Sequence, residues 1–191
     1  MPRVLNFARL GEPILYEKTP AIADPTAPQI QEAIADMLHT MEVKGPCFGL
    51  AAPQVFLPLR ITIFSIPKVP HHNRYSYTPE YDPDGVPQTI MINPEITVLD
   101  QKTTPGWEGC LSVPGLLGEV ERYHSIRYTF QSLDGQTHTR EAHGFHARVV
   151  QHEMDHLDGI LYTMRMKNLR SLTFSEENLK HRELFETHKS D

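Results

Sequence analysis

Two histidines and a glutamate near residue 150 have the types and spacing of a metal-dependent hydrolase. His152 and His156 lie four residues apart, and Glu153 directly follows the first of them. Residues four apart share one face of an α-helix, so both imidazoles can bind one metal ion. Glu153 is offset by one position, so it can reach a metal-activated water as a general base without being a ligand. A buried histidine can also be merely hydrogen-bonded, so the spacing alone leaves metal binding open.

A helix must carry these side chains, and the neighbouring residues predict one that is buried. The N-terminal part of this helix is hydrophobic on nearly every face. The apolar residues are Ala142, Phe145, Ala147, Val149, Val150 and Leu157. Gly159 follows as the residue type that most often ends a helix.

A catalytic metal site needs a third protein ligand and one open position. Cys110 is one candidate, on a stretch (103–118) whose prolines and glycines predict a constrained loop without regular structure, although a single cysteine is usually an inert apolar residue. Glu176 or Glu177 is another, as in thermolysin-like zinc proteases. A third histidine of the metzincin type is absent, because His156 is followed by Leu-Asp-Gly-Ile-Leu.

Prolines and capping residues predict the secondary structure near the two ends of the chain. Three prolines indicate an extended N-terminal arm over residues 1–23. Asp24-Pro25 is a favourable start for an amphipathic helix that ends near Gly45. The sequence Thr173-Phe174-Ser175-Glu176 fits a capping box that opens a charged C-terminal helix.

Alternating apolar residues and turn signals predict strands in between. We expect them over 60–66, 89–92, 96–99, from Arg122 onward, 125–133 and 137–142. Asn93-Pro94 separates the second strand from the third, and Asp134-Gly135 predicts a type I′ hairpin. The polar stretch 67–87 predicts a long surface loop that could cover a cleft or form an oligomer contact.

Composition restricts the classes of function. A chain of 191 residues predicts one domain, with or without an appendage. The net charge is −6 and no basic stretch is present, so we expect no nucleic-acid binding. Two cysteines do not form a disulfide framework, and no apolar run is long enough for a membrane span. The N-terminus lacks signal-peptide features. We expect a reducing, cytoplasmic setting; a mature organellar protein would look the same.

Three separated motifs resemble those of the peptide deformylase family. The first is Gly49-Leu50-Ala51-Ala52-Pro53-Gln54, the second is Glu108-Gly109-Cys110-Leu111-Ser112, and the third is Gln151-His152-Glu153-Met154-Asp155-His156. The resemblance covers roughly residues 10–166, so we expect one catalytic domain (1–170) and a C-terminal helical tail (171–191). It implies an α+β fold, in which antiparallel sheets wrap around the central metal-binding helix, with an N-terminal and a C-terminal helix.

The resemblance also implies the metal and the reaction. Cys110, His152 and His156 would bind one divalent ion, commonly Fe²⁺ in the cell, with Ni²⁺, Co²⁺ or Zn²⁺ possible in preparations. The implied activity removes the N-formyl group from the formyl-methionine that begins new polypeptides, and releases formate. The partners would be N-formyl-methionyl peptides and nascent chains at the ribosome, and the protein would be a monomer or a homodimer.

Individual roles follow from the same resemblance. Glu153 would move the proton, while the Gln54 amide and the Leu111 N–H would stabilise the oxyanion. The expected substrate-binding residues are Gly49, Cys47, Phe48, Glu108, Gly109, Arg122, Phe145 and Val149. Arg122 could equally be a surface strand residue, and we interpret Arg148 as a salt bridge at the edge of the pocket.

Cys47 departs from the family pattern, because the first motif usually begins with glycine at this position. The cysteine is similar to mitochondrial-type deformylases, as is the stretch 115–123, and we expect it to line or narrow the site without binding metal.

Three rival functions remain. A zinc protease using Glu176 or Glu177 leaves Cys110 unexplained. A non-catalytic metal-binding module needs a fourth protein ligand, and none lies nearby in sequence. A simple binding domain would tolerate Glu153→Gln.

Overall fold

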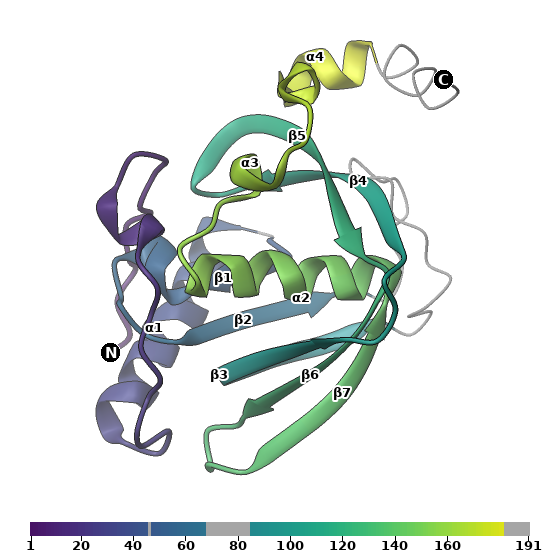
Figure 1. The fold of residues 1–191 in the computed structure, drawn as a ribbon. Helices are drawn as coiled ribbons and strands as arrows, with labels where there is room; N and C mark the ends of the chain where they lie inside the picture. Colours follow the sequence, from purple (N-terminus) through teal and green to yellow (C-terminus); the bar gives the residue numbers. More distant parts are fainter. Residues whose placement is uncertain (46, 68–84, 182–191) are drawn as a thin grey trace.

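The computed structural model describes residues 1–45, 47–67 and 85–181, and it places helix α2 (Gly144–Leu157) between two antiparallel sheets (Figure 1). The five-stranded sheet has the order β1-β2-β3-β6-β7, and the three-stranded sheet has the order β4-β5-β8. The predicted α+β fold, with sheets around a central helix, is confirmed. Gly159, with φ +73°, follows the end of α2 as predicted.

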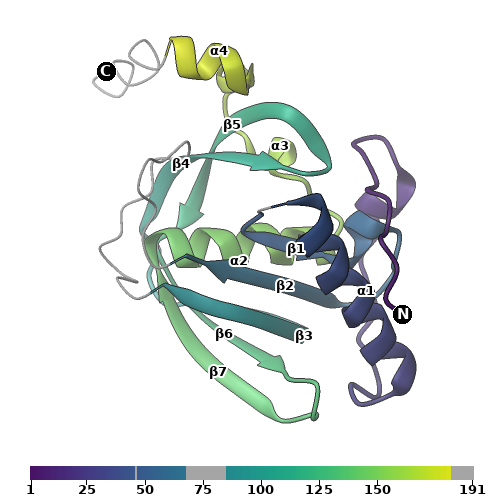
Figure 2. The ribbon, with the colours of Figure 1, turned by 180° about the vertical axis from the view of Figure 1, so that it is seen from behind.

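The five-stranded sheet is covered on both faces near β2. Its strands are β1 (Gly49–Ala51), β2 (Ile61–Ile66), β3 (Val86–Val98), β6 (Ser125–Gln131) and β7 (Thr137–His143). Ile61 and Ile63 pack in the cluster that contains the N-terminal helix α1, whereas Phe64 and Ile66 pack in the cluster that contains α2. Because strand side chains alternate between faces, β2 is apolar on both. Figure 2 shows α1 and α2 from behind.

Helix α1 (Pro28–Lys44) begins later than predicted and ends where predicted. The start at Asp24-Pro25 is wrong because the Asp24 carboxylate accepts the Thr26 N–H at 2.9 Å and forms a turn instead. Pro28 then occupies the first helical turn. Gly45 ends the helix with φ +101°.

Asn93-Pro94 does not end a strand, so the prediction of two strands is wrong. Strand β3 is continuous, and its register with β6 shifts between Ile92 and Glu95. Asn93 has φ +51°, and its side chain exchanges two hydrogen bonds with the main chain of Ile22, at 2.7 and 2.8 Å. The N-terminal arm therefore holds this bulge in place.

The stretch 103–118 forms regular structure, against the prediction of a loop. Strands β4 (Thr103–Cys110) and β5 (Val113–Tyr123) make a long antiparallel hairpin, and Arg122 lies near the end of β5 instead of beginning a strand. Gly106 lies where an α2 side chain meets β4, and a Cβ there would lie 2.8 Å from the Arg148 guanidinium and force that side chain to shift.

The β6–β7 hairpin is confirmed, but its turn is not type I′. That turn needs positive φ at both central residues, and only Gly135 has it, with φ +78°. The loop is longer, with the Ser132 N–H donating to the Gln136 carbonyl.

The C-terminal part packs on β5. After α3 (Tyr162–Arg165), strand β8 (Thr173–Phe174) pairs with β5, and α4 (Ser175–Lys180) follows. The C-terminal helix is confirmed, but the capping box is wrong because Thr173 lies in β8 and its hydroxyl does not cap α4. Short 3₁₀ turns occur at η1 (Pro13–Tyr16), η2 (Ala52–Val55) and η3 (Leu169–Ser171).

Most of the predicted loop 67–87 and of the tail beyond Lys180 lies outside the described residues. Within the described part of the chain, none of the helices has the length and apolar character needed to cross a bilayer.

Candidate metal centre

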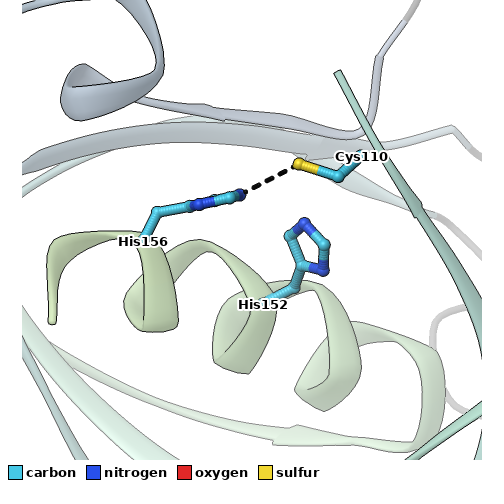
Figure 3. A group of neighbouring side chains, drawn as sticks. All are labelled: Cys110, His152 and His156. Carbon is cyan, nitrogen blue, oxygen red and sulfur yellow. Dashed lines mark hydrogen bonds between the residues drawn. The ribbon is translucent and has the colours of Figure 1, made fainter. Parts of the chain in front are cut away.

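Three ligands of a metal-binding type converge where α2 faces the end of β4 (Figure 3). His152 and His156 project from one face of α2, and Cys110 is the last residue of β4. The Cys110 Sγ lies 3.3 Å from the His156 Nε2, and the three ligand atoms all lie within 4.8 Å of one another. One sulfur and two imidazole nitrogens suit a divalent transition metal. The donor set therefore fits one such ion, with Cys110 as the third ligand.

The alternative ligands on α4 do not join this group. Glu177 is exposed and lies 2.7 Å from Lys180, in an ion pair within its own helix. Glu176 lies in the same first turn. Among the described residues, the cluster of closely spaced metal-ligand side chains contains Cys110, His152 and His156.

Glu108 orients one of the two imidazoles. Its Oε2 lies 2.8 Å from the His152 Nδ1, so the other ring nitrogen of His152 is left to face Cys110. The ring of Tyr162 stacks on His152, with a centroid distance of 6.3 Å. A carboxylate on the non-ligating nitrogen fixes the tautomer and raises the basicity of a ligand histidine.

Buried arginines keep Glu108 ionised. Burial raises the pKa of this carboxyl, but the charge and hydrogen bonds of Arg122 and the contact with His152 hold the pKa well below its usual range. Arg122 binds both carboxylate oxygens at 2.9 Å and also pairs with Asp155. With 4% of its surface exposed, Arg122 is not a surface strand residue, so that interpretation is wrong.

Arg148 forms the predicted salt bridge at the edge of the pocket. Its Nη1 lies 2.8 Å from Glu108 and 2.9 Å from the Val120 carbonyl, and its Nη2 lies 2.7 Å from the Thr104 carbonyl. The guanidinium therefore ties α2 to both β4 and β5.

Glu153 is buried directly beside β1. The carboxylate occupies the place that a side chain at Gly49 would fill, and the Thr62 hydroxyl lies 3.5 Å from its Oε2. Burial raises the pKa of Glu153; the two histidines oppose this and the charge of Cys110 adds to it, so the pKa stays above the usual range. A raised pKa suits a carboxylate that must both take and return a proton near neutral pH.

Gln54 is held with its amide N–H₂ toward Cys110. Its Oε1 accepts the Ala51 N–H at 2.8 Å, which fixes the orientation of the amide group. Its Nε2 then lies 3.3 Å from both the Cys110 Sγ and the Ser112 Oγ. A fixed donor beside the ligands is the kind of group that stabilises a developing oxyanion.

A cleft of about 900 Å³ opens above these groups. Twelve of the predicted site residues line it: Cys47, Phe48, Gly49, Gln54, Glu108, Gly109, Cys110, Leu111, Phe145, Val149, His152 and Glu153. His156 is buried behind the cleft wall with 1% exposed, and Arg122 lies behind Glu108. The rings of Phe48 and Phe145 meet edge to face at 5.0 Å and make part of the apolar wall.

Several residues at the site were not predicted, among them Trp107, Ser112, Thr62 and Tyr162. Trp107 lines the cleft, and the other three contact Gln54, Glu153 and His152. Ser112 belongs to the second motif, so its position two residues after Cys110 was an available signal. No local sequence signal marks Thr62 or Tyr162, because their contacts cross between elements.

The chain matches the family model described as polypeptide deformylase over residues 4–171. The chain belongs to the peptide deformylase family. Peptide deformylase 2 of Pseudomonas syringae pv. tomato is 43% identical over 91% of this chain and 93% of that protein. Peptide deformylase 1 of Bordetella pertussis is 42% identical over 88% of this chain and 90% of that protein.

Solved deformylase structures share the fold. A class I type b peptide deformylase from Acinetobacter baumannii, bound to Met-Ala-Ser, gives a TM-score of 0.74 at 34% identity and covers 87% of this chain and 100% of that one. The Thermotoga maritima peptide deformylase gives 0.71 at 29% identity and covers 87% and 99%. As a deformylase, the chain is a metallohydrolase that removes the N-formyl group from new polypeptides, and its metal site is of the Cys-His-His type.

Proposed function

We propose that this deformylase acts in the cytoplasm on formyl-methionine at the start of nascent chains, with one Fe²⁺ ion bound by Cys110, His152 and His156. The observation that carries the proposal is the convergence of these three ligands beside Glu153 and Gln54, at the wall of one cleft. The bacterial source of the curated relatives supports a cytoplasmic setting. Ni²⁺, Co²⁺ or Zn²⁺ would fit the same donors after purification.

Glu153 is the proposed proton carrier. A divalent ion held by Cys110, His152 and His156 would lower the pKa of a water molecule and polarise a carbonyl oxygen. Glu153 takes a proton from water as the water oxygen bonds to the formyl carbon, and it delivers this proton to the amine nitrogen as the C–N bond breaks, so that formate and a free N-terminus result. Gln54, through its Nε2, and Leu111, through its main-chain N–H, donate to the oxyanion formed on the way. Glu108 keeps His152 oriented throughout.

The methionine side chain is proposed to lie against the apolar wall of the cleft. Phe145 and Val149 present this wall from α2, and Phe48 completes it. Gly109 lets the peptide main chain approach closely, because it has no side chain, whereas the missing side chain of Gly49 leaves room for Glu153. The Met-Ala-Ser complex of the Acinetobacter enzyme supports a peptide that begins with methionine. Arg122, which does not line the cleft, serves the site through Glu108.

Formate release from formyl-Met-Ala-Ser tests the proposal. Wild type and Glu153→Gln are purified without oxygen and assayed for metal and for formate. We expect about one metal per chain in both, and a rate at least about 10²-fold lower in the variant, because a positioned general base contributes about 10²–10⁴.

A metal-loaded wild type that releases no formate would refute the proposal. Casein is incubated with the same preparations, because a zinc protease would cleave it without formyl groups. Iron as the native metal is refuted separately if Fe²⁺-loaded protein is less active than Zn²⁺-loaded protein.

A further inference from the structure

The N-terminal arm is hydrogen-bonded to all three catalytic segments. The Ala8 N–H donates to the Gln54 carbonyl at 2.8 Å, and the Leu10 N–H donates to the Ser112 carbonyl at 2.8 Å. Thr19 donates twice to the Leu157 carbonyl, from its N–H at 2.8 Å and its hydroxyl at 3.0 Å. In Figures 1 and 2, the arm runs in purple beside the C-terminal end of α2.

Each acceptor adjoins a group that performs the reaction. Gln54 is itself the proposed oxyanion donor. Ser112 accepts the Gln54 Nε2 on its hydroxyl, and its own N–H lies 3.4 Å from the Cys110 Sγ. Leu157 directly follows His156 in α2. A shift of the arm would therefore move the oxyanion donor and two metal ligands relative to one another.

Buried apolar side chains also hold the arm in place. Ala8 and Leu15 are fully buried in a cluster with Val113 and Val120 of β5, and Cys110 packs against that cluster. These contacts hold the arm against β5 and beside Cys110.

We propose that the arm is a positioning element for deformylation, in which Ala8 and Leu10 hold Gln54 and the Cys110–Ser112 segment, and Thr19 holds the end of α2. The proposal rests on the proposed function. The three segments come from η2, the β4–β5 turn and α2, which are separate elements. Their relative placement sets the distance from the donors to the reacting carbonyl, and a displacement of about 1 Å can cost about 10²-fold in rate.

Leu10→Pro removes one of these donors selectively. Leu10 is the second residue of a turn closed by the Glu12 N–H on the Arg9 carbonyl, at 2.9 Å, and Gly11 follows with φ +108°. Turns with positive φ at the third residue accept proline at the second. Proline therefore suits the turn while abolishing the N–H bond to Ser112. Leu10→Ala is the matched variant, because it keeps the N–H and trims a half-exposed side chain.

We expect kcat for formyl-Met-Ala-Ser to be at least about 10-fold lower in Leu10→Pro than in Leu10→Ala, with KM within about threefold. The reason is that the displaced groups act on the transition state and not on substrate binding. Metal content should stay near one per chain. Equal kcat in folded, metal-loaded samples of the two variants would overturn the proposal for this contact.

Thr19→Val provides a second test if Leu10→Pro does not fold. Valine has nearly the same shape and removes the hydroxyl donor next to His156. At a temperature well below both melting temperatures, where global unfolding contributes little to metal loss, we expect EDTA to strip the metal at least about threefold faster than from wild type. A contact that serves only global stability would lower the melting temperature and leave this low-temperature rate unchanged. Wild type without formate release would count against the proposed function, and an unchanged stripping rate would count against the arm.

Discussion

Cys47 and Glu153 face the same cleft, and their proximity affects the protonation of the thiol. Burial raises the pKa of Cys47 to about 11, and the negative charge of Glu153 adds to the shift. The thiolate is the nucleophilic and metal-binding form of cysteine, so a raised pKa makes the thiol inert near neutral pH. Cys47 therefore lines the cleft as a small, neutral side chain, whereas Cys110 lies among the histidines.

We predict that Cys47 reacts slowly with iodoacetamide. With a pKa of about 11, roughly one thiol in a thousand is ionised at pH 8, and this fraction rises about tenfold per pH unit until the pKa is reached. Alkylation of metal-loaded protein, followed by peptide mass spectrometry, measures the rate. In Cys47→Ala any remaining alkylation comes from Cys110, so this variant is the control. Glu153→Gln should speed the reaction by removing the negative charge. Labelling at pH 8 as fast as in a short cysteine peptide would contradict the raised pKa.

The ligands and the base could be predicted because their information is local. His152, Glu153 and His156 lie within one turn and a half of helix, and Cys110 lies in a recognisable motif. The contacts that support the ligands from behind could not be predicted in this way. Arg122 meets Asp155 only because β5 crosses α2, and the two residues are 33 positions apart in sequence. Nothing in either local sequence indicates that contact.

The end of α2 is fixed by a close approach to the N-terminal arm. Gly159 has φ +73°, and a Cβ at this position would lie 2.6 Å from the carbonyl carbon and oxygen of Tyr16. Main-chain atoms cannot move aside as a flexible side chain can. Glycine is thus required both for the left-handed backbone and for the contact.

Gly159→Ala should therefore destabilise the protein more than Gly115→Ala. Gly115 has a similar φ of +79°, but an added Cβ there would meet nothing within 4 Å. The second variant measures the backbone cost alone, which is about 1 kcal/mol, and the first adds the steric cost. Urea unfolding of both variants gives the difference in free energy. Equal destabilisation would show that Tyr16 moves away without cost.

The stretch 103–118 was predicted to be irregular from its composition, but it forms β4 and part of β5. Its prolines and glycines are poor strand formers by composition. Pro105 is tolerated because β4 is an edge strand, in which an N–H can lack a partner strand without loss of a hydrogen bond. Gly106 and Gly118 lie where side chains of α2 and of the segment after it press against the hairpin. Only the packed structure supplies these reasons, whereas the β6–β7 hairpin follows from alternation within a single segment.

The metal site joins the two halves of the molecule. Cys110 comes from the three-stranded sheet, while His152 and His156 come from the helix that packs on the five-stranded sheet. A metal bound by all three is a cross-link between the sheets. Glu108 and Arg148 make a parallel link from β4 to α2, at 2.8 Å, that does not depend on metal.

Removal of the metal should consequently lower the stability of the whole fold. Binding to the native state alone stabilises it by RT ln(1 + [metal]/Kd), about 4 kcal/mol when free metal is a thousandfold above Kd. We expect EDTA to lower the melting temperature of wild type by several degrees in calorimetry, with a single transition, because the Glu108–Arg148 link still holds the sheets together.

Cys110→Ala, which lacks one ligand, should show a much smaller change with EDTA. An equal change in both proteins would mean that Cys110 does not bind the metal. Two separate transitions in stripped wild type would mean that the metal, and not the buried ion pairs, makes the sheets unfold together.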